Sequence, residues 1–120
     1  MKQELLKYLV TGVLAVGTDY VSYTLLLHIL THSEAKAISY ICGTGVAFFL
    51  NRVWTFKSSN KAHQDAVKFT VLYASSLVVN VLLNKTVLFI FPTYISIAFI
   101  IATGTTIVMN YVGQKFFVFK

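Results

Sequence analysis

Residues 52–57 read RVWTFK and residues 115–120 read KFFVFK, so the chain closes two long apolar stretches with a similar pattern of basic and aromatic residues. A short polar loop at residues 58–61 separates the two halves that end in this way. The chain therefore consists of two copies of one unit. Such duplication is typical of small membrane proteins whose functional site lies between repeats.

The beginnings of the two halves match as well. Lys7 opens the first apolar run and Asp19 follows twelve positions later, while Lys68 opens the second run and Asn80 follows at the same distance. At about 1.5 Å of rise per residue, each polar residue lies roughly 18 Å beyond its lysine in a helix. The spacing predicts that Asp19 and Asn80 lie at matching depths past the middle of a membrane.

The composition indicates an integral membrane protein. Of 120 residues, 57% are hydrophobic and only 12% are charged, which is far from the composition of a soluble domain. A hydrocarbon core about 30 Å thick needs about 20 residues of helix. We predict an all-α protein with four transmembrane helices near residues 5–30, 36–56, 67–91 and 94–115, which leaves no room for a soluble catalytic domain.

The basic residues predict the orientation of these helices. Short connections make consecutive helices antiparallel, and eight of the ten Lys and Arg residues then fall on one side: Lys2, Lys7, Arg52, Lys57, Lys61, Lys68, Lys115 and Lys120. Only Lys36 and Lys85 fall toward the other side. By the positive-inside rule both termini and the central loop are cytoplasmic. The chain is thus expected to be N-in/C-in, with two parallel two-helix repeats, and its charge of +6 requires no nucleic acid partner.

Polar residues within the apolar stretches are candidates for function. A carboxylate inside a membrane costs about 2.5 to 3.5 kcal/mol on insertion scales, so it is expected to face a cavity or a cationic partner. We hypothesise that one polar cluster in the outer half of the membrane contains Asp19, Asn80, Asn84 and Lys85. The alternative is structural: the aspartate is tied to amides between helices while the lysine extends toward the membrane surface.

Two stripes of small and polar residues predict helix contacts. Ser39, Gly43, Ala47 and Asn51 follow one another at four-residue steps in the second stretch; the fourth stretch carries Thr103, Thr106, Asn110 and Gly113 along one face. Small residues allow helix backbones to approach closely. We expect both stripes to mark helix interfaces.

The cytoplasmic ends of these stripes combine amides with cations. Arg52 follows Asn51, and Lys115 follows Gln114. An arginine can hold a phosphate through two hydrogen bonds, and Lys57 and Lys115 would add positive charge. The alternative is that these cations serve only as positive-inside anchors.

The chain carries no recognisable catalytic or metal-binding motif. His28 and His32 have the spacing of a metal-binding pair, but only Glu34 is nearby as a further ligand, so we expect no metal site. We find no glycine-rich nucleotide loop, no Ser/His/Asp arrangement and no paired carboxylates. We therefore expect a protein that is not an enzyme and that uses no cofactor.

The two endings resemble those of the GtrA-like family. Residues 48–56 read FFLNRVWTF and residues 110–119 read NYVGQKFFVF, and members of that family end each half with an asparagine, a basic residue and an aromatic-x-Phe sequence. The resemblance covers essentially the whole chain. Two positions depart from a strict repeat, since Ala47 aligns with Asn110 and Asn51 aligns with Gln114.

The resemblance implies a role in bacterial cell-surface polysaccharide or teichoic acid glycosylation. Family members are thought to act as flippases that move a polyprenyl-phosphate-linked sugar from the cytoplasmic to the outer leaflet of the bacterial inner membrane. A separate membrane glycosyltransferase then uses the sugar in the cell wall or its polysaccharides. We expect the lipid phosphate to be drawn to Arg52, Lys57, Lys68 and Lys115, and the sugar to meet the amides of Asn51, Asn110 and Gln114.

Two other functions remain open at this point. A small proton-coupled multidrug exporter also has four short helices and an acidic residue in the first, although such exporters often lack the charge bias seen here. The second alternative is an accessory subunit that stabilises a membrane glycosyltransferase without transporting anything. In every case membrane lipid surrounds the chain, and a homodimer is expected because 120 residues are few for a closed headgroup path.

Overall fold

The computed structural model describes residues 2–120, and all regular secondary structure in this range is helical. The chain divides into two compact units between Ser58 and Ser59. Each unit is a helical hairpin, and the same order of elements occurs in both: a long helix, a helix of 19 residues and a five-residue π-helix. The two halves read from the sequence thus have the same local architecture.

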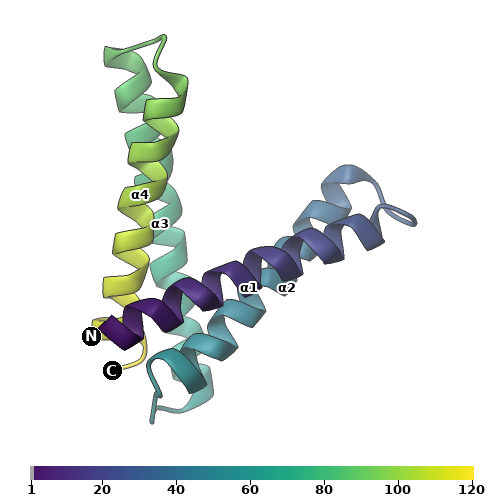
Figure 1. Cartoon of the computed structure of the whole chain (residues 1–120), viewed down its shortest axis with the longest axis vertical. Helices are drawn as coiled ribbons and strands as arrows, with labels where there is room; N and C mark the ends of the chain where they lie inside the picture. Colours follow the sequence, from purple (N-terminus) through teal and green to yellow (C-terminus); the bar gives the residue numbers. More distant parts are fainter. Residues whose placement is uncertain (1) are drawn as a thin grey trace. The chain divides into compact units, whose positions relative to one another are not determined.

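In the first unit, α1 (Lys2–Leu26) and α2 (His32–Leu50) lie side by side, and the π-helix η1 (Asn51–Thr55) continues α2 (Figure 1). Helix α1 ends before residue 30, its expected end. The backbone amides of residues 28 and 29 donate hydrogen bonds to carbonyls only three positions back, so the chain forms tighter turns there. Thr31 and Glu34 then form a reciprocal capping box that starts α2.

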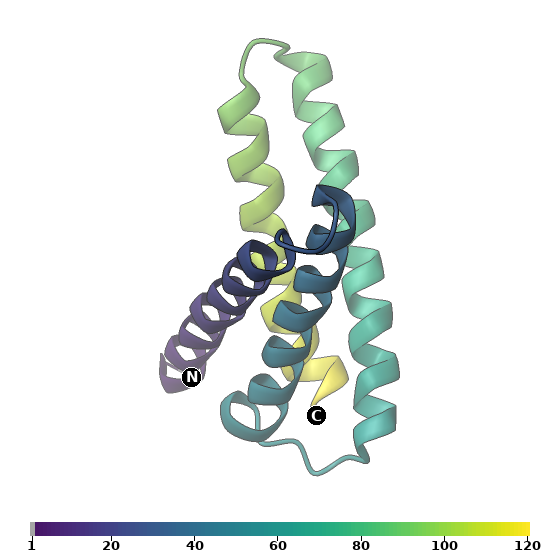
Figure 2. The same ribbon diagram turned by 90° about the vertical axis from the view of Figure 1, so that its right-hand side faces the viewer.

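In the second unit, α3 (Ala62–Ile90) pairs with α4 (Ile95–Gly113), and the π-helix η2 (Gln114–Val118) continues α4 (Figure 2). Pro92 follows the end of α3, where it cannot continue the helix. The rings of Phe91 and Tyr94 stack across this turn with centroids 5.6 Å apart, and the Tyr94 amide donates to the Phe91 carbonyl. This local contact closes the hairpin.

Three helical segments are long and apolar enough to cross a membrane: Lys2–Leu26, Ala62–Ile90 and Ile95–Val118. Their apolar side chains are largely exposed, as expected for surfaces that face lipid. The chain is therefore a multi-pass membrane protein. Helix α2 begins with a polar turn at residues 31–36, which shortens its apolar part, so a fourth crossing by α2 stays a prediction.

The predicted small-residue stripe of the first unit is a packing surface. Ser39, Gly43, Ala47 and Asn51 are all buried. A Cβ atom on Gly43 would approach the Ala15 carbonyl oxygen, so glycine permits the close approach of α1 and α2.

The stripe of the second unit is buried less uniformly. Thr106 is buried, while Thr103, Asn110 and Gly113 are half-buried. The buried face of α4 is centred instead on Ala98, Ala102 and Thr106, and the Leu72 side chain packs directly against Gly113. Both hairpins therefore rely on small residues in their second helix, at partly different positions.

Candidate functional site

Basic and aromatic side chains meet at one end of the first unit. The Lys7 ammonium lies 5.5 Å from the centre of the Trp54 ring, which η1 carries. The rings of Tyr8 and Phe56 lie 6.4 Å apart at the same end. The π-helix is closed by a bond from the Phe56 amide to the Asn51 carbonyl, and Trp54 lies within this wider turn.

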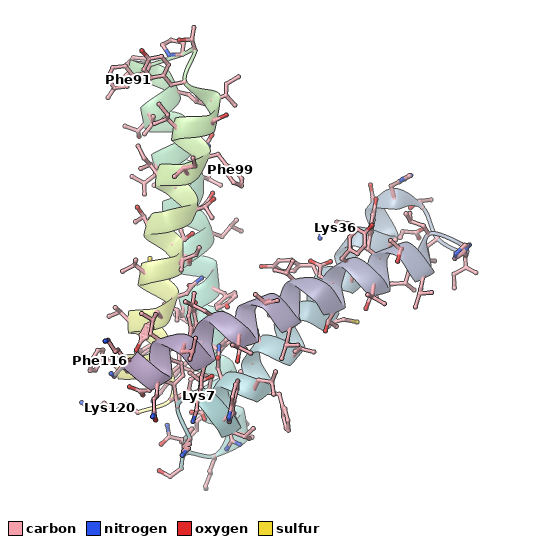
Figure 3. All side chains as sticks on the ribbon, in the orientation of Figure 1. Lys7, Lys36, Phe91, Phe99, Phe116 and Lys120 are labelled. Atoms are coloured by element: carbon pink, nitrogen blue, oxygen red, sulfur yellow. The ribbon has the colours of Figure 1, made fainter. Side chains whose placement is uncertain are left out.

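The second unit repeats this arrangement. The Lys68 ammonium lies 5.7 Å from the centre of the Phe117 ring on η2, and the Lys115 ammonium lies 5.5 Å from the Phe116 ring. Figure 3 shows Phe116 and Lys120 at one end of this hairpin and Phe91 at the other. Each unit thus holds a lysine of its long helix over an aromatic ring of its π-helix, as cation–π contacts require.

The amides expected to meet a headgroup lie inside the fold. Asn51 is 1% exposed, and its Oδ1 accepts a hydrogen bond of 2.9 Å from the Thr55 hydroxyl. Thr55 in turn lies 3.4 Å from the hydroxyl of Thr11 on α1, also buried. Gln114 is fully buried as well. These amides pack within the fold, and their contact with a substrate stays a prediction.

Leu72 and Val118 occupy the positions in the second unit that Thr11 and Thr55 occupy in the first. The hydroxyl pair of one hairpin is therefore an apolar pair in the other. Asn110 is half-buried, and within residues 2–120 its buried Oδ1 accepts no hydrogen bond. At the end that carries the π-helix, the interiors of the two units thus differ in polarity, although both units have the same order of helices.

The remaining predicted cations occupy different settings. Arg52 is half-buried within η1. Lys57 is exposed and has a positive φ of 48°, a left-handed conformation that reverses the chain after the helix. Lys115 lies beside Tyr111 as well as Phe116. Their convergence on one phosphate stays a prediction.

Asp19 is bound by partners from α2. The Lys36 ammonium donates to both carboxylate oxygens of Asp19, at 2.9 and 2.8 Å, and the Ser39 hydroxyl donates to Oδ1 at 2.6 Å. Sequence reasoning assigned Lys36 only to the outer side of the membrane and missed this pair. The signal was present, because Lys36 and Ser39 are three positions apart and precede Gly43 on one helix face.

Asn80 has a partner in its own unit as well. Its Nδ2 donates to the Thr106 hydroxyl over 3.4 Å, whereas Asn84 is half-buried and Lys85 is exposed. Asp19 belongs to the first unit and these residues to the second. A single polar cluster that joins Asp19 with Asn80, Asn84 and Lys85 stays a prediction.

A family model supports the resemblance seen in the sequence. The model of the GtrA/DPMS transmembrane domain matches residues 7–119. No solved structure matches the chain.

Proposed function

The chain belongs to the GtrA/DPMS transmembrane-domain family, and from this premise we propose that it moves a polyprenyl-phosphate-linked sugar across the bacterial cytoplasmic membrane. The sugar would serve glycosylation of cell-surface polysaccharide or teichoic acid by a separate membrane glycosyltransferase. The protein itself is not an enzyme in this proposal. Its four helices cross the membrane with both termini in the cytoplasm.

The observation that carries this proposal is the repeated lysine–aromatic arrangement at one end of each hairpin. Lys7 lies over Trp54, and Lys68 lies over Phe117. Aromatic rings favour the membrane–water interface, and each nearby basic residue contributes about 1 kcal/mol to the attraction of an anionic lipid surface. Two such ends at the cytoplasmic face would collect a lipid phosphate and leave its tail in the bilayer.

The structure of the Asp19 site argues against a multidrug exporter. A carboxylate that exchanges protons for cationic drugs must be accessible to both. Here Lys36 already occupies both oxygens of Asp19, and Ser39 donates a further hydrogen bond. The carboxylate is therefore neutralised by the protein itself.

Reconstitution of the purified protein alone in liposomes tests the proposal. A fluorescent polyprenyl-phosphate-linked sugar is placed in both leaflets, and a membrane-impermeant quencher reports how fast the inner pool reaches the outside. We expect transbilayer movement well above that of protein-free liposomes. Arg52→Lys is the matched variant, because it retains the charge that sets topology but loses bidentate phosphate binding.

The possible results separate the candidate functions. Movement of the lipid-linked sugar supports the proposal, and a lower rate in Arg52→Lys places the phosphate at Arg52. Proton-coupled uptake of an organic cation would replace the proposal with an exporter. If neither activity occurs alone but a co-purified glycosyltransferase is stabilised, the protein is an accessory subunit.

A further inference from the structure

A shallow, largely open depression of about 560 Å³ lies along the first turns of α2, at the end of the first unit opposite its lysine–aromatic contact. It is lined by His32, Ser33, Lys36, Ala37 and Tyr40. Figure 3 shows Lys36 and Lys7 toward opposite ends of this hairpin. With the basic ends in the cytoplasm, the depression lies in the outer half of the membrane.

The Lys36 side chain is exposed, and an anion could replace Asp19 as the partner of its ammonium group. Its side chain is 58% exposed, whereas that of Asp19 is 20% exposed. A lysine ammonium has three N–H donors, and the two carboxylate oxygens leave one of them for another acceptor. Because Ser39 also donates to Asp19, the carboxylate keeps a hydrogen bond if Lys36 turns toward an anion in the depression.

One aromatic ring lies near this cation, and two more rings lie beside it or line the depression. The Tyr23 ring lies 6.0 Å from the Lys36 ammonium and 6.4 Å from the His32 ring. Tyr40 contributes to the wall of the depression. Aromatic faces with hydroxyl and imidazole groups suit a sugar joined to a phosphate, since they offer apolar contact together with hydrogen bonds.

The second unit indicates that the ion pair is not needed to build the hairpin. The positions that correspond to Asp19, Lys36 and Ser39 are Asn80, Phe99 and Ala102. That unit forms the same helical hairpin without a charged pair at this depth. A carboxylate and an ammonium in a membrane are costly, so their presence in one unit alone calls for a role beyond packing.

From these observations we propose that Lys36 is the phosphate-binding residue of an outer-half site, which holds the phosphate of a lipid-linked sugar before release. This inference rests on the proposed function. It assigns a binding site in the outer half of the membrane to the substrate that the protein is proposed to move. Asp19 keeps Lys36 neutralised when the site is empty, and the phosphate replaces Asp19 as the partner of the ammonium.

Acetylation of lysines tests the site residue by residue. The full chain in lipid nanodiscs is treated with sulfosuccinimidyl acetate, and mass spectrometry follows the modification of Lys36 and of the exposed Lys85. The probes are farnesyl phosphate, farnesol and inorganic phosphate. At a farnesyl phosphate concentration about ten times its Kd, mass action slows Lys36 acetylation about tenfold, with Lys85 unchanged.

The inference is wrong if Lys36 is acetylated at the same rate with and without farnesyl phosphate. It is also wrong if farnesyl phosphate protects Lys85 as strongly as Lys36, or if inorganic phosphate or farnesol protects Lys36 as strongly as farnesyl phosphate does. A second measurement uses Asp19→Asn/Lys36→Gln, which removes both charges and so avoids an unpaired carboxylate. Calorimetry with farnesyl phosphate should show the loss of one class of sites in this variant, while Asp19→Asn alone retains it. Unchanged binding in the double variant would also refute the site.

The two proposals fail separately. Protection of Lys36 without sugar movement in liposomes supports the phosphate site and removes the proposed function. Sugar movement without protection of Lys36 supports the function and removes the outer-half site.

Discussion

A Cβ atom on Gly43 would lie 2.7 Å from the carbonyl oxygen of Ala15, so α1 and α2 approach each other with no space for a side chain at this point. The same Cβ would lie 3.1 Å from the Cβ of Asp19. The glycine therefore also sets the distance across which Lys36 and Ser39 reach the carboxylate.

Gly43→Ala is expected to destabilise the first unit by about 1 to 3 kcal/mol, because the contact is with backbone that must move. Thermal unfolding of the purified protein in detergent measures the effect. Gly45→Ala is the matched control, since its Cβ meets nothing within 4 Å. The Gly45→Ala variant should be as stable as the unmodified protein or more stable, because alanine has a better helix propensity than glycine. Equal losses in both variants would contradict the close approach.

Lys36→Gln is expected to destabilise the protein because it leaves the Asp19 carboxylate within a membrane-spanning helix without its cation. Insertion scales place the cost of such a charge at about 2.5 to 3.5 kcal/mol. Stability is measured by unfolding the protein in mixed micelles that contain increasing proportions of a denaturing detergent. A double-mutant cycle with Asp19→Asn supplies the control. The double variant should be more stable than Lys36→Gln, and additive losses would show that the two charges do not interact.

Thr55→Val is expected to cost about 1 kcal/mol, because Asn51 loses the 2.9 Å hydrogen bond from the threonine hydroxyl. Thr11→Val should cost less, since its contact with Thr55 is long at 3.4 Å. Thermal unfolding under identical conditions compares the two variants. In the second unit, Val118→Thr is the reverse change, and it should be destabilising because it buries a hydroxyl at a fully buried position. A larger loss in Thr11→Val than in Thr55→Val would refute this order.

Single cysteines are expected to report the central loop on the cytoplasmic side and the turns of both hairpins on the outer side. In a Cys42→Ser background, Ser33→Cys and Thr93→Cys should react with an impermeant maleimide from outside intact cells, whereas Ser59→Cys should react only after lysis. This result requires α2 to cross the membrane. Labelling of both Ser33→Cys and Ser59→Cys in intact cells would show that α2 does not cross, and labelling of Ser59→Cys alone would show the opposite orientation.

Much of the fold is readable from the sequence. Long apolar runs between polar loops predict helices because a buried or lipid-facing helix satisfies its own backbone hydrogen bonds. The duplicated endings predict two similar units, and the structure has the same element order in both. The small-residue stripe through Ser39, Gly43 and Ala47 is buried, which confirms it as a packing surface.

The candidate site was less predictable. The lysines at the membrane boundary and Asp19 stand out by charge alone, but the partners of these side chains lie on other helices. Pairing between helices depends on their rotation and crossing, which spacing along one helix does not determine. For this reason the contact between Lys36 and Asp19 was missed, and the burial of Gln114, which lies outside the two predicted stripes, was not foreseen.

The sequence by itself determined that the chain is a helical membrane protein of two similar halves with basic, aromatic ends, because hydropathy, charge and repetition are properties of the chain alone. Only the tertiary structure decided which side chains meet. Gly43 brings α1 and α2 into close contact, Lys36 thereby reaches Asp19, and the π-helices place Trp54 and Phe117 beside their lysines. Each of these contacts follows from the distance and rotation between packed helices.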